Sequence, residues 1–230
     1  MIRSLVVRLL LAVFGMLTLY QGWLFAEVWW YTSRNPSSSA LMDERLAQLQ
    51  QTSPDAHLQQ RWVPYSQISP WLKRAVIASE DSTFVQNNGF DWQGIRYAAQ
   101  KDLSKGRIVA GGSTITQQLA KNLFLSDRRT PGRKLEEAII TIMLEHMMSK
   151  RRILELYLNL IEWGNGIFGA EAAAQHYFHT SASQLSPTQA ARLAAMIPDP
   201  RYFDHRRNAR GMLRHAATIE ARMTLVSAPR

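Results

Sequence analysis

An uncharged apolar run near the N-terminus constrains this chain more than any other feature. Residues 9–26 read LLLAVFGMLTLYQGWLFA and contain no Asp, Glu, Lys or Arg. At about 1.5 Å per helical residue the run spans roughly 27 Å, close to the hydrocarbon thickness of a bilayer. A cleaved signal peptide is the alternative, but its apolar region is shorter and ends in a small-residue cleavage site, which is not evident here. The run predicts an uncleaved transmembrane anchor over residues 9–31.

The charges beside this run predict its orientation in the membrane. Arg3 and Arg8 precede it, and the next basic residue is Arg34. Because positively charged flanks stay in the cytoplasm, residues 1–8 are expected there and the rest of the chain outside it. Aromatic side chains suited to an interfacial belt stand at the exit: Trp23, Trp29, Trp30 and Tyr31.

Composition narrows the classes of partner. The chain of 230 residues has 27 Lys and Arg against 18 Asp and Glu, a net charge of +9, and no cysteine. Without cysteine, a disulfide framework and cysteine-ligated metal sites are excluded. A basic chain favours anionic partners, and beside an anchor these are lipid headgroups and phosphorylated substrates rather than nucleic acid.

Beyond the anchor the pattern is mainly helical. Residues 32–60 are expected to be a linker with a short helix at 40–51, residues 61–215 a domain, and residues 216–230 a C-terminal tail. Apolar positions recur at helical spacing and few segments alternate, so the fold class is mainly α. Start signals stand at Ser69-Pro70, Thr114 with Gln117, and Ser186-Pro187 with Gln189. Helices are expected at 70–81, 91–103, 114–125, 133–148, 150–161, 168–178 and 187–197.

Two adjacent acids are the first candidate for chemistry. Glu80 and Asp81 stand where a helix with an apolar face ends, and acids are normally favoured at helix starts. Conflicts with such local rules cluster at functional sites. A partly desolvated carboxyl has a raised pKa, which suits general acid or base work. The alternative is a pair of solvated charges at a helix end.

The second candidate combines glycines with polar side chains. Gly111 and Gly112 allow close backbone approach to a ligand, and the helix after them begins with free backbone donors. The alternative is a capped helix after a loop, but the polar density favours phosphate or sugar binding. Its polar residues are Ser113, Thr114, Gln117, Gln118, Lys121 and Asn122.

The third candidate is a charged cluster at a helix start. Arg133 and Glu137 share a helix face and Lys134 lies beside them, so two cations and a carboxylate could grip a diphosphate. The alternative is a surface ion pair worth a few tenths of a kcal/mol, which is favoured when the cluster is taken alone. Residues 150–159 and 162–173 look structural, as a core stripe and as a turn before a close-packed helix.

Taken in order, these five segments resemble the peptidoglycan glycosyltransferase family. This is the transglycosylase domain that occurs alone in monofunctional enzymes and fused in class A penicillin-binding proteins. The segments read EDSTF with GFD, GGSTITQQLAKN, RKLEE, KRRILELYLN and GIFGAEAAAQHYF, between residues 68 and 203. The resemblance implies the monofunctional form, with a lysozyme-like larger lobe and a small membrane-facing jaw, expected between Gly94 and Leu125. It also implies a single-pass protein of the bacterial inner membrane with a periplasmic catalytic domain.

The resemblance also implies roles for individual residues. Glu80 matches the catalytic glutamate, a general base that takes the proton from the acceptor sugar's 4-hydroxyl. Glu137 matches a second catalytic glutamate near the donor diphosphate, which Lys121, Arg133 and Lys134 would hold. The remaining substrate-binding residues would be Asp81, Phe84, Ser113, Thr114, Gln117, Gln118 and Asn122.

Partners and cofactors follow from the same resemblance. The substrates would be lipid II and the growing glycan chain on undecaprenyl diphosphate, with membrane lipids beside them. Penicillin-binding and division proteins are candidate partners, and nucleic acid is not expected. No metal ligands are predicted, although a divalent cation, Mg²⁺ or Mn²⁺, assists some members. One departure stands out, since Asn87 occupies a position where the family usually has histidine.

Two other functions stay open at this point. A lytic transglycosylase or muramidase would need an acid for a glycosidic oxygen but no cations for a diphosphate, so the three basic residues argue against it. An inactive membrane scaffold of the cell-wall machinery would keep the fold without the chemistry, and the two intact glutamates count against that.

Overall fold

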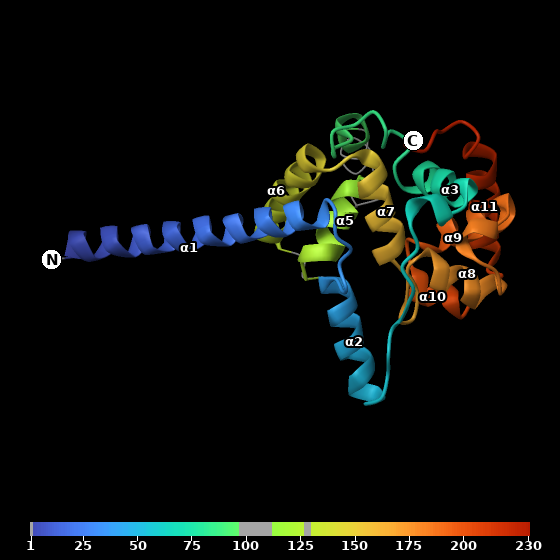
Figure 1. Cartoon of the computed structure of the whole chain (residues 1–230), viewed down its shortest axis with the longest axis horizontal. Coiled ribbons are helices and arrows are strands. Elements are labelled where there is room, and N and C mark those ends of the chain that lie inside the picture. The colour runs from blue at the N-terminus through green and yellow to red at the C-terminus, as the bar shows by residue number, and fades with distance from the viewer. Residues whose placement is uncertain (1, 97–111, 127–129) are drawn as a thin grey trace, which may run out of the picture. The chain divides into compact units, whose positions relative to one another are not determined.

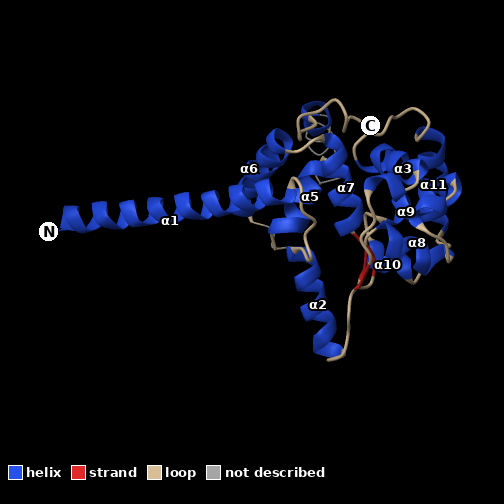
Figure 2. Cartoon of the chain, in the orientation of Figure 1, coloured by secondary structure: helices blue, strands red, loops and turns tan. Residues whose placement is uncertain are grey.

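The computed structural model describes residues 2–96, 112–126 and 130–230 (Figure 1). Helices dominate in the described residues (Figure 2), which confirms the predicted mainly α class. The chain divides into two compact units, Met1–Pro36 and Ser37–Arg230, and each is considered by itself.

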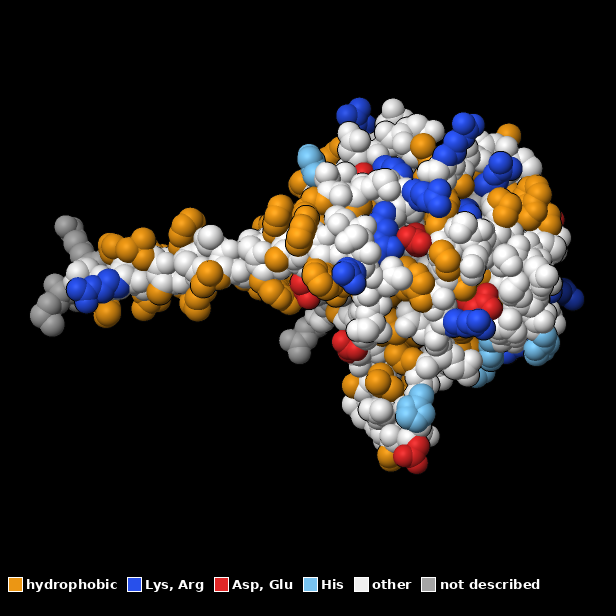
Figure 3. All heavy atoms as spheres, viewed as in Figure 1, with side chains coloured by type: hydrophobic (Ala, Val, Ile, Leu, Met, Phe, Trp, Pro, Cys, Tyr) orange, Lys and Arg blue, Asp and Glu red, His pale blue; other side chains and the backbone are white. Residues whose placement is uncertain are grey.

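The first unit is one long helix. Helix α1 covers Ile2–Tyr31, and its part from Ser4 to Tyr31 is long and apolar enough to cross a membrane by length and composition. Hydrophobic side chains stand out along the length of this helix (Figure 3), and Trp23, Trp29 and Trp30 are exposed. These features fit the predicted anchor, although the helix already begins within residues 1–8.

The second unit holds the predicted site. Helix α9 packs against both α3 and α11, and α5 packs against α2, α6 and α7. The largest fully buried side chains include Trp163, Tyr157, Phe84 and Phe168. The helices are α2 (Ala40–Thr52), α3 (Pro70–Glu80), α5 (Ile115–Phe124), α6 (Pro131–Met147), α7 (Lys150–Leu160), α8 (Ala170–Phe178), α9 (Pro187–Met196), α10 (Pro200–Asp204) and α11 (Arg210–Arg222), with 3₁₀ turns η1 (Tyr65–Gln67) and η2 (Ala182–Gln184).

The predicted start signals are confirmed in detail. Ser69 Oγ accepts a hydrogen bond from Trp71 N at 3.2 Å, with Pro70 at the first helical position. Helices α5 and α9 both begin with complete capping boxes, Thr114 with Gln117 and Ser186 with Gln189. Each box satisfies two backbone donors that would otherwise lack partners, and this fixes where the helix starts.

Two helix starts differ from the prediction by two residues, whereas the other predicted boundaries among the described helices agree to within one. Helix α6 begins at Pro131 rather than at residue 133, because Thr130 caps it and accepts from Arg133 N at 3.2 Å. Helix α8 begins at Ala170 rather than at residue 168, because Gly169 adopts φ 81°. A Cβ on Gly169 would lie 2.8 Å from Asn159 O, so only glycine fits this turn.

A small sheet joins distant segments of this unit. Its order is β1 (Gln59–Gln60), β3 (Ile167–Phe168) and β2 (Glu162–Gly164), with β1 parallel and β2 antiparallel to β3. Strand β1 falls in the expected linker. Helix α11 was not predicted and runs through the expected boundary at residue 215.

Two of the predicted features include residues that the structure does not describe. The helix expected at 91–103 is seen at 92–96, and its remainder lies outside the described residues. Residues 97–111 of the apolar jaw, which is expected between residues 94 and 125, lie outside the described residues as well. Exposed apolar side chains do occur nearby, at Trp92, Leu135 and Ile142.

Candidate active site

Glu80 is the last residue of α3, and its carboxylate is held on both oxygens. Ser79 Oγ donates to Oε1 at 3.0 Å, and Gln118 Nε2 of α5 donates to Oε2 at 3.0 Å. Gln118 is itself fixed, because its Oε1 accepts from Tyr157 OH at 2.8 Å and Tyr157 is fully buried in α7. Three helices therefore orient this carboxylate.

Burial raises the pKa of Glu80 above its usual value, and the hydrogen bonds from Gln118 and Ser79 lower it in part. The cause is desolvation, which disfavours the ionised form of a carboxyl group. A carboxylate with a raised pKa takes up a proton more readily. This property suits a general base that works near neutral pH.

Asp81 follows immediately but serves a different set of contacts. It is buried at 7% exposure, and its carboxylate accepts from Asn87 Nδ2 at 2.9 and 3.1 Å and from Ile115 N at 3.2 Å. Lys150 Nζ donates to Asn87 Oδ1 at 3.2 Å. Asn87 therefore supports Asp81 and the start of α5, and among the described residues it makes no hydrogen bond to Glu80.

Several other predicted substrate contacts support the fold in the same way. Thr114 and Gln117 are buried, and their side chains are used in the capping box of α5. Phe84 is fully buried, with Lys150 Nζ 4.6 Å from its ring centroid. Ser113, by contrast, is exposed, so its substrate contact stays a prediction.

A cavity of about 340 Å³ lies beside Gln118. Lys121 and Asn122, one turn further along α5, also line it, and their contact with a substrate stays a prediction. The cavity also reaches residues that sequence reasoning did not select as site residues, Arg45 of α2 and Glu162 of β2. Glu80 is thus linked through Gln118 to a cavity that carries both charges and hydrogen-bonding groups.

The third predicted cluster forms at the start of α6. Glu137 is buried at 3% exposure, and its carboxylate accepts from Arg133 Nη1 at 2.9 Å and from Lys134 Nζ. This burial rules out the alternative of a solvated surface ion pair. Helix α6 packs against α5, but among the described residues no hydrogen bond or ion pair joins this cluster to Glu80.

The residues that sequence reasoning missed carried little local signal. Arg45 and Glu162 form an ion pair at 3.1 Å although they are 117 positions apart. The one hint is that Glu162 interrupts an apolar run between Ile161 and Trp163. Arg201 also lines the cavity. In the sequence it follows Pro198 and Pro200, which mark the end of a helix and do not indicate a binding site.

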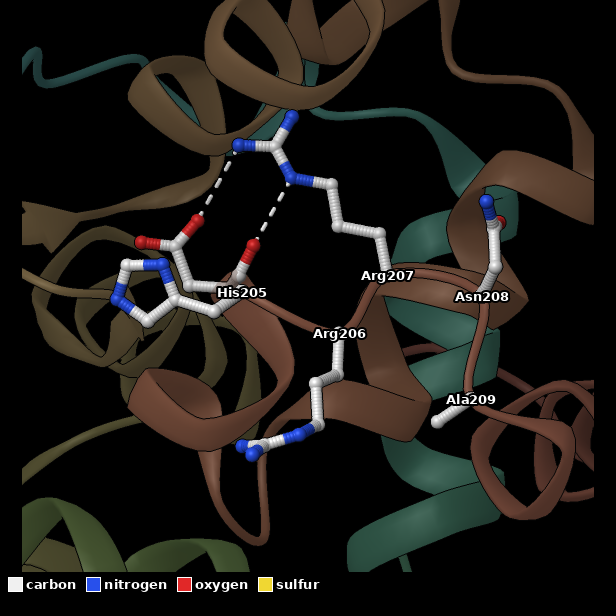
Figure 4. A pocket seen from close by; sticks show the side chains of 6 residues that line it. His205, Arg206, Arg207, Asn208 and Ala209 are labelled. Carbon is white, nitrogen blue, oxygen red and sulfur yellow. Dashed lines mark hydrogen bonds and ion pairs between the residues drawn. The ribbon is translucent and has the colours of Figure 1, made fainter.

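A larger hollow of about 480 Å³ lies elsewhere, at residues 204–209. Figure 4 shows Arg207 folded back on the acid that precedes this turn, while Arg206 points to the opposite side. Arg207 Nε donates to Asp204 O at 3.0 Å, and Tyr177 OH donates to the Asp204 carboxylate at 3.0 Å. The Asp204 carboxylate already has hydrogen-bond partners, and none of the predicted site residues lines this hollow. The hollow is therefore not the candidate active site.

A divalent cation has no evident protein site in the part of the chain that is described. No group of three or more His, Asp or Glu side chains is arranged to hold one there. The metal requirement therefore stays a prediction, and no step below is routed through a metal.

Comparison with known proteins identifies the family of this chain. A family profile described as Transglycosylase matches residues 45–224. Three relatives called "Biosynthetic peptidoglycan transglycosylase" are similar over nearly their whole length. They come from Methylobacillus flagellatus (62% identical, 100% of both chains), Laribacter hongkongensis (58%, 97% of this chain and 98% of the relative) and Chromobacterium violaceum (57%, 96% and 97%). With a matching profile over most of its length and relatives this similar, the chain belongs to the transglycosylase family.

Proposed function

We propose that this protein polymerises lipid II into linear glycan strands of peptidoglycan and releases undecaprenyl diphosphate. One observation carries the proposal: Glu80, a carboxylate with a raised pKa, accepts a hydrogen bond from Gln118, and Gln118 lines a cavity together with Lys121. A base next to a cationic cavity suits a reaction in which a hydroxyl loses its proton and a diphosphate departs.

In the proposed reaction Glu80 takes the proton of the acceptor sugar's 4-hydroxyl. The hydroxyl oxygen forms a bond to the anomeric carbon of the growing chain, and the bond from that carbon to the diphosphate oxygen breaks with inversion. The electron pair leaves with the diphosphate. Lys121, Arg133 and Lys134 would neutralise this charge, and Glu137 would hold the last two cations in place.

The proposed location is the bacterial inner membrane, with α1 as the single span and the catalytic unit on the periplasmic side. Arg3 and Arg8 before the apolar run support this orientation. Beside the bilayer, the catalytic unit would meet its lipid-linked substrate directly. Membrane lipids, penicillin-binding proteins and division proteins are the proposed partners.

Two substrates separate this function from its alternatives. The full-length protein in liposomes is incubated with lipid-linked disaccharide precursor and, separately, with purified sacculi. We expect glycan polymer from the precursor and no soluble muropeptides from the sacculi. A lytic enzyme would give the reverse result, and an inactive scaffold would give neither product.

The pH dependence of the reaction is expected to report on Glu80. Because the ionised form is the base and burial raises the pKa of Glu80, kcat should fall as the pH drops through a value above the usual 4.5 of a glutamate. The variant Q118L loses a hydrogen bond that favours the ionised form, so its acid limb should move to higher pH. Pre-steady-state or initial-rate profiles from about pH 4 to pH 9 measure this shift. Q67L, at an exposed glutamine in η1, is the matched control, and coincident acid limbs for Q118L and Q67L would contradict the role of Glu80.

A further inference from the structure

Arg201, at the start of α10, is a cation that lines the cavity beside Gln118 but has no part in the proposed reaction. It is exposed to solvent, and it makes no hydrogen bond or ion pair with any described residue. A guanidinium group carries N–H donors, no acceptor and a permanent positive charge. An arginine that is not engaged by the protein therefore fits a ligand that brings anionic acceptor oxygens into the cavity.

The backbone of Arg201 is held firmly, although its side chain is free. Helix α10 packs against β2 and α9, and Pro200 restricts the chain just before Arg201. At the other end of α10 the Asp204 carboxylate accepts from Asn165 N at 3.2 Å and from Tyr177 OH at 3.0 Å. A ligand that binds Arg201 would have to order only a side chain, which keeps the entropic cost of binding small.

The other charges of the cavity do not cancel that of Arg201. Arg45 and Glu162 form an ion pair at 3.1 Å, so these two charges offset each other. Lys121 of α5 adds a second cation, and Asp199 is the remaining acid, which leaves the lining residues with a net charge of +1. Burial raises the pKa of Glu162, whereas the positive charges of Arg45 and Arg201 lower it. The guanidinium of Arg201 is therefore close enough to act on charges in the cavity.

We infer that Arg201 is a further substrate-binding residue, which donates to the diphosphate oxygens of the substrate from α10 while Lys121 approaches them from α5. The inference rests on the proposed function, because the proposed reaction supplies this anion. An arginine suits the task, since its planar guanidinium can donate two parallel hydrogen bonds to a phosphate, whereas a lysine acts as a point charge. Two cations from separate helices would fix the orientation of the diphosphate as well as neutralise it.

Binding is measured without turnover, in full-length E80Q in detergent micelles. The Kd of the lipid-linked disaccharide precursor should be about tenfold weaker for E80Q/R201A, because hydrogen bonds to a charged group are lost. E80Q/R201K keeps the charge without the paired donors and should fall between the two. E80Q/R206A is the matched control, since Arg206 is also exposed but lies 4.3 Å from the Tyr202 ring and lines the other hollow (Figure 4). Because Arg201 is exposed, R201A should melt within about 2 °C of its parent.

A substitution at Asp199 should have the opposite sign. Asp199 is exposed, lines the same cavity and does not cap α10 with its side chain, so D199N should leave the helix start intact. It removes a negative charge next to the bound anion, and precursor binding by E80Q/D199N should be about two- to threefold tighter than by E80Q. Both effects should shrink when NaCl is raised from about 0.05 to about 0.5 M. Changes of the same sign in R201A and D199N would overturn the electrostatic role.

Small anions test the chemistry that is recognised. Inorganic pyrophosphate and glutarate, a dicarboxylate, are titrated into wild type and R201A at equal ionic strength. The variant should bind pyrophosphate about tenfold more weakly and glutarate less than about threefold more weakly, because the phosphate oxygens match the guanidinium and Lys121 together. An equal or larger loss for glutarate would overturn the assignment to the diphosphate.

Two results with the precursor would overturn the role of Arg201 itself. One is equal Kd values for E80Q and E80Q/R201A, and the other is a loss as large in E80Q/R206A. Failure of wild type to polymerise any precursor would instead overturn the proposed function, and the pyrophosphate titration does not depend on that result.

Discussion

The variant E80Q is expected to lose about a thousandfold in kcat for glycan polymerisation and to bind the lipid-linked substrate within about threefold of wild type. General-base catalysis contributes about 10²- to 10⁴-fold, and an amide cannot accept the proton of the sugar hydroxyl. The geometry should survive, because the glutamine oxygen can still accept from Gln118 Nε2 or Ser79 Oγ. Initial rates of polymer formation and an independent binding measurement separate the two quantities.

Stability provides the control for this prediction. Because burial raises the folded-state pKa of Glu80, its ionised form costs stability at pH values above that pKa, whereas the protonated form does not. Glutamine is neutral at every pH, so E80Q should unfold at neutral pH no more easily than wild type. Thermal unfolding at neutral pH and at about pH 5 measures this, and the advantage of E80Q should shrink at the lower pH.

The conservative variant E80D completes the series. Aspartate keeps a base but withdraws it by one methylene, so intermediate activity is expected. Polymerisation by E80Q at the wild-type rate would show that another group takes the proton. Loss of substrate binding in E80Q would show that Glu80 acts mainly in recognition.

How far the sequence predicted this site depends on how local each signal is. The start of α5 could be predicted because Thr114 and Gln117 stand three residues apart and cap the same helix. Glu80 could be singled out because an acid at a helix end conflicts with the helix dipole. In both cases one short stretch of sequence carries the whole physical argument.

The contacts that complete the site are not local. Arg45 reaches Glu162 across 117 positions, and nothing in either segment names the other. Strands β1 and β3 pair over two residues each, too short for an alternating pattern. The burial of Glu137 could not be predicted from the sequence either. Its i,i+4 spacing from Arg133 is typical of a surface ion pair, but the Glu137 side chain is only 3% exposed.

The double variant R133A/K134A is expected to lose both activity and stability. Without these two side chains the charge of the departing diphosphate is less well neutralised, so kcat/KM should fall by about 10²- to 10³-fold. It also leaves Glu137, at 3% exposure, without either of its ion-pair partners. An uncompensated buried carboxylate costs about 3 kcal/mol, or roughly 8 °C in the melting temperature of a chain this size. Activity alone therefore cannot distinguish a substrate-binding role from a structural one in this variant.

The triple variant R133A/K134A/E137Q separates the two effects. Glutamine removes the buried charge, so the melting temperature should return to within about 2 °C of wild type while kcat/KM stays low. The single variant E137Q should keep its fold, because the glutamine oxygen can still accept from Arg133 Nη1 and Lys134 is half exposed. It should lose activity because the two cations are held less firmly. Wild type, R133A/K134A, E137Q and the triple variant are compared by thermal unfolding and by polymerisation rate.

Recovery of both stability and activity in the triple variant would show that Arg133 and Lys134 serve only to pair Glu137. Recovery of stability alone would show that folding needs no net charge at this cluster, and that the two cations act on the diphosphate of the substrate.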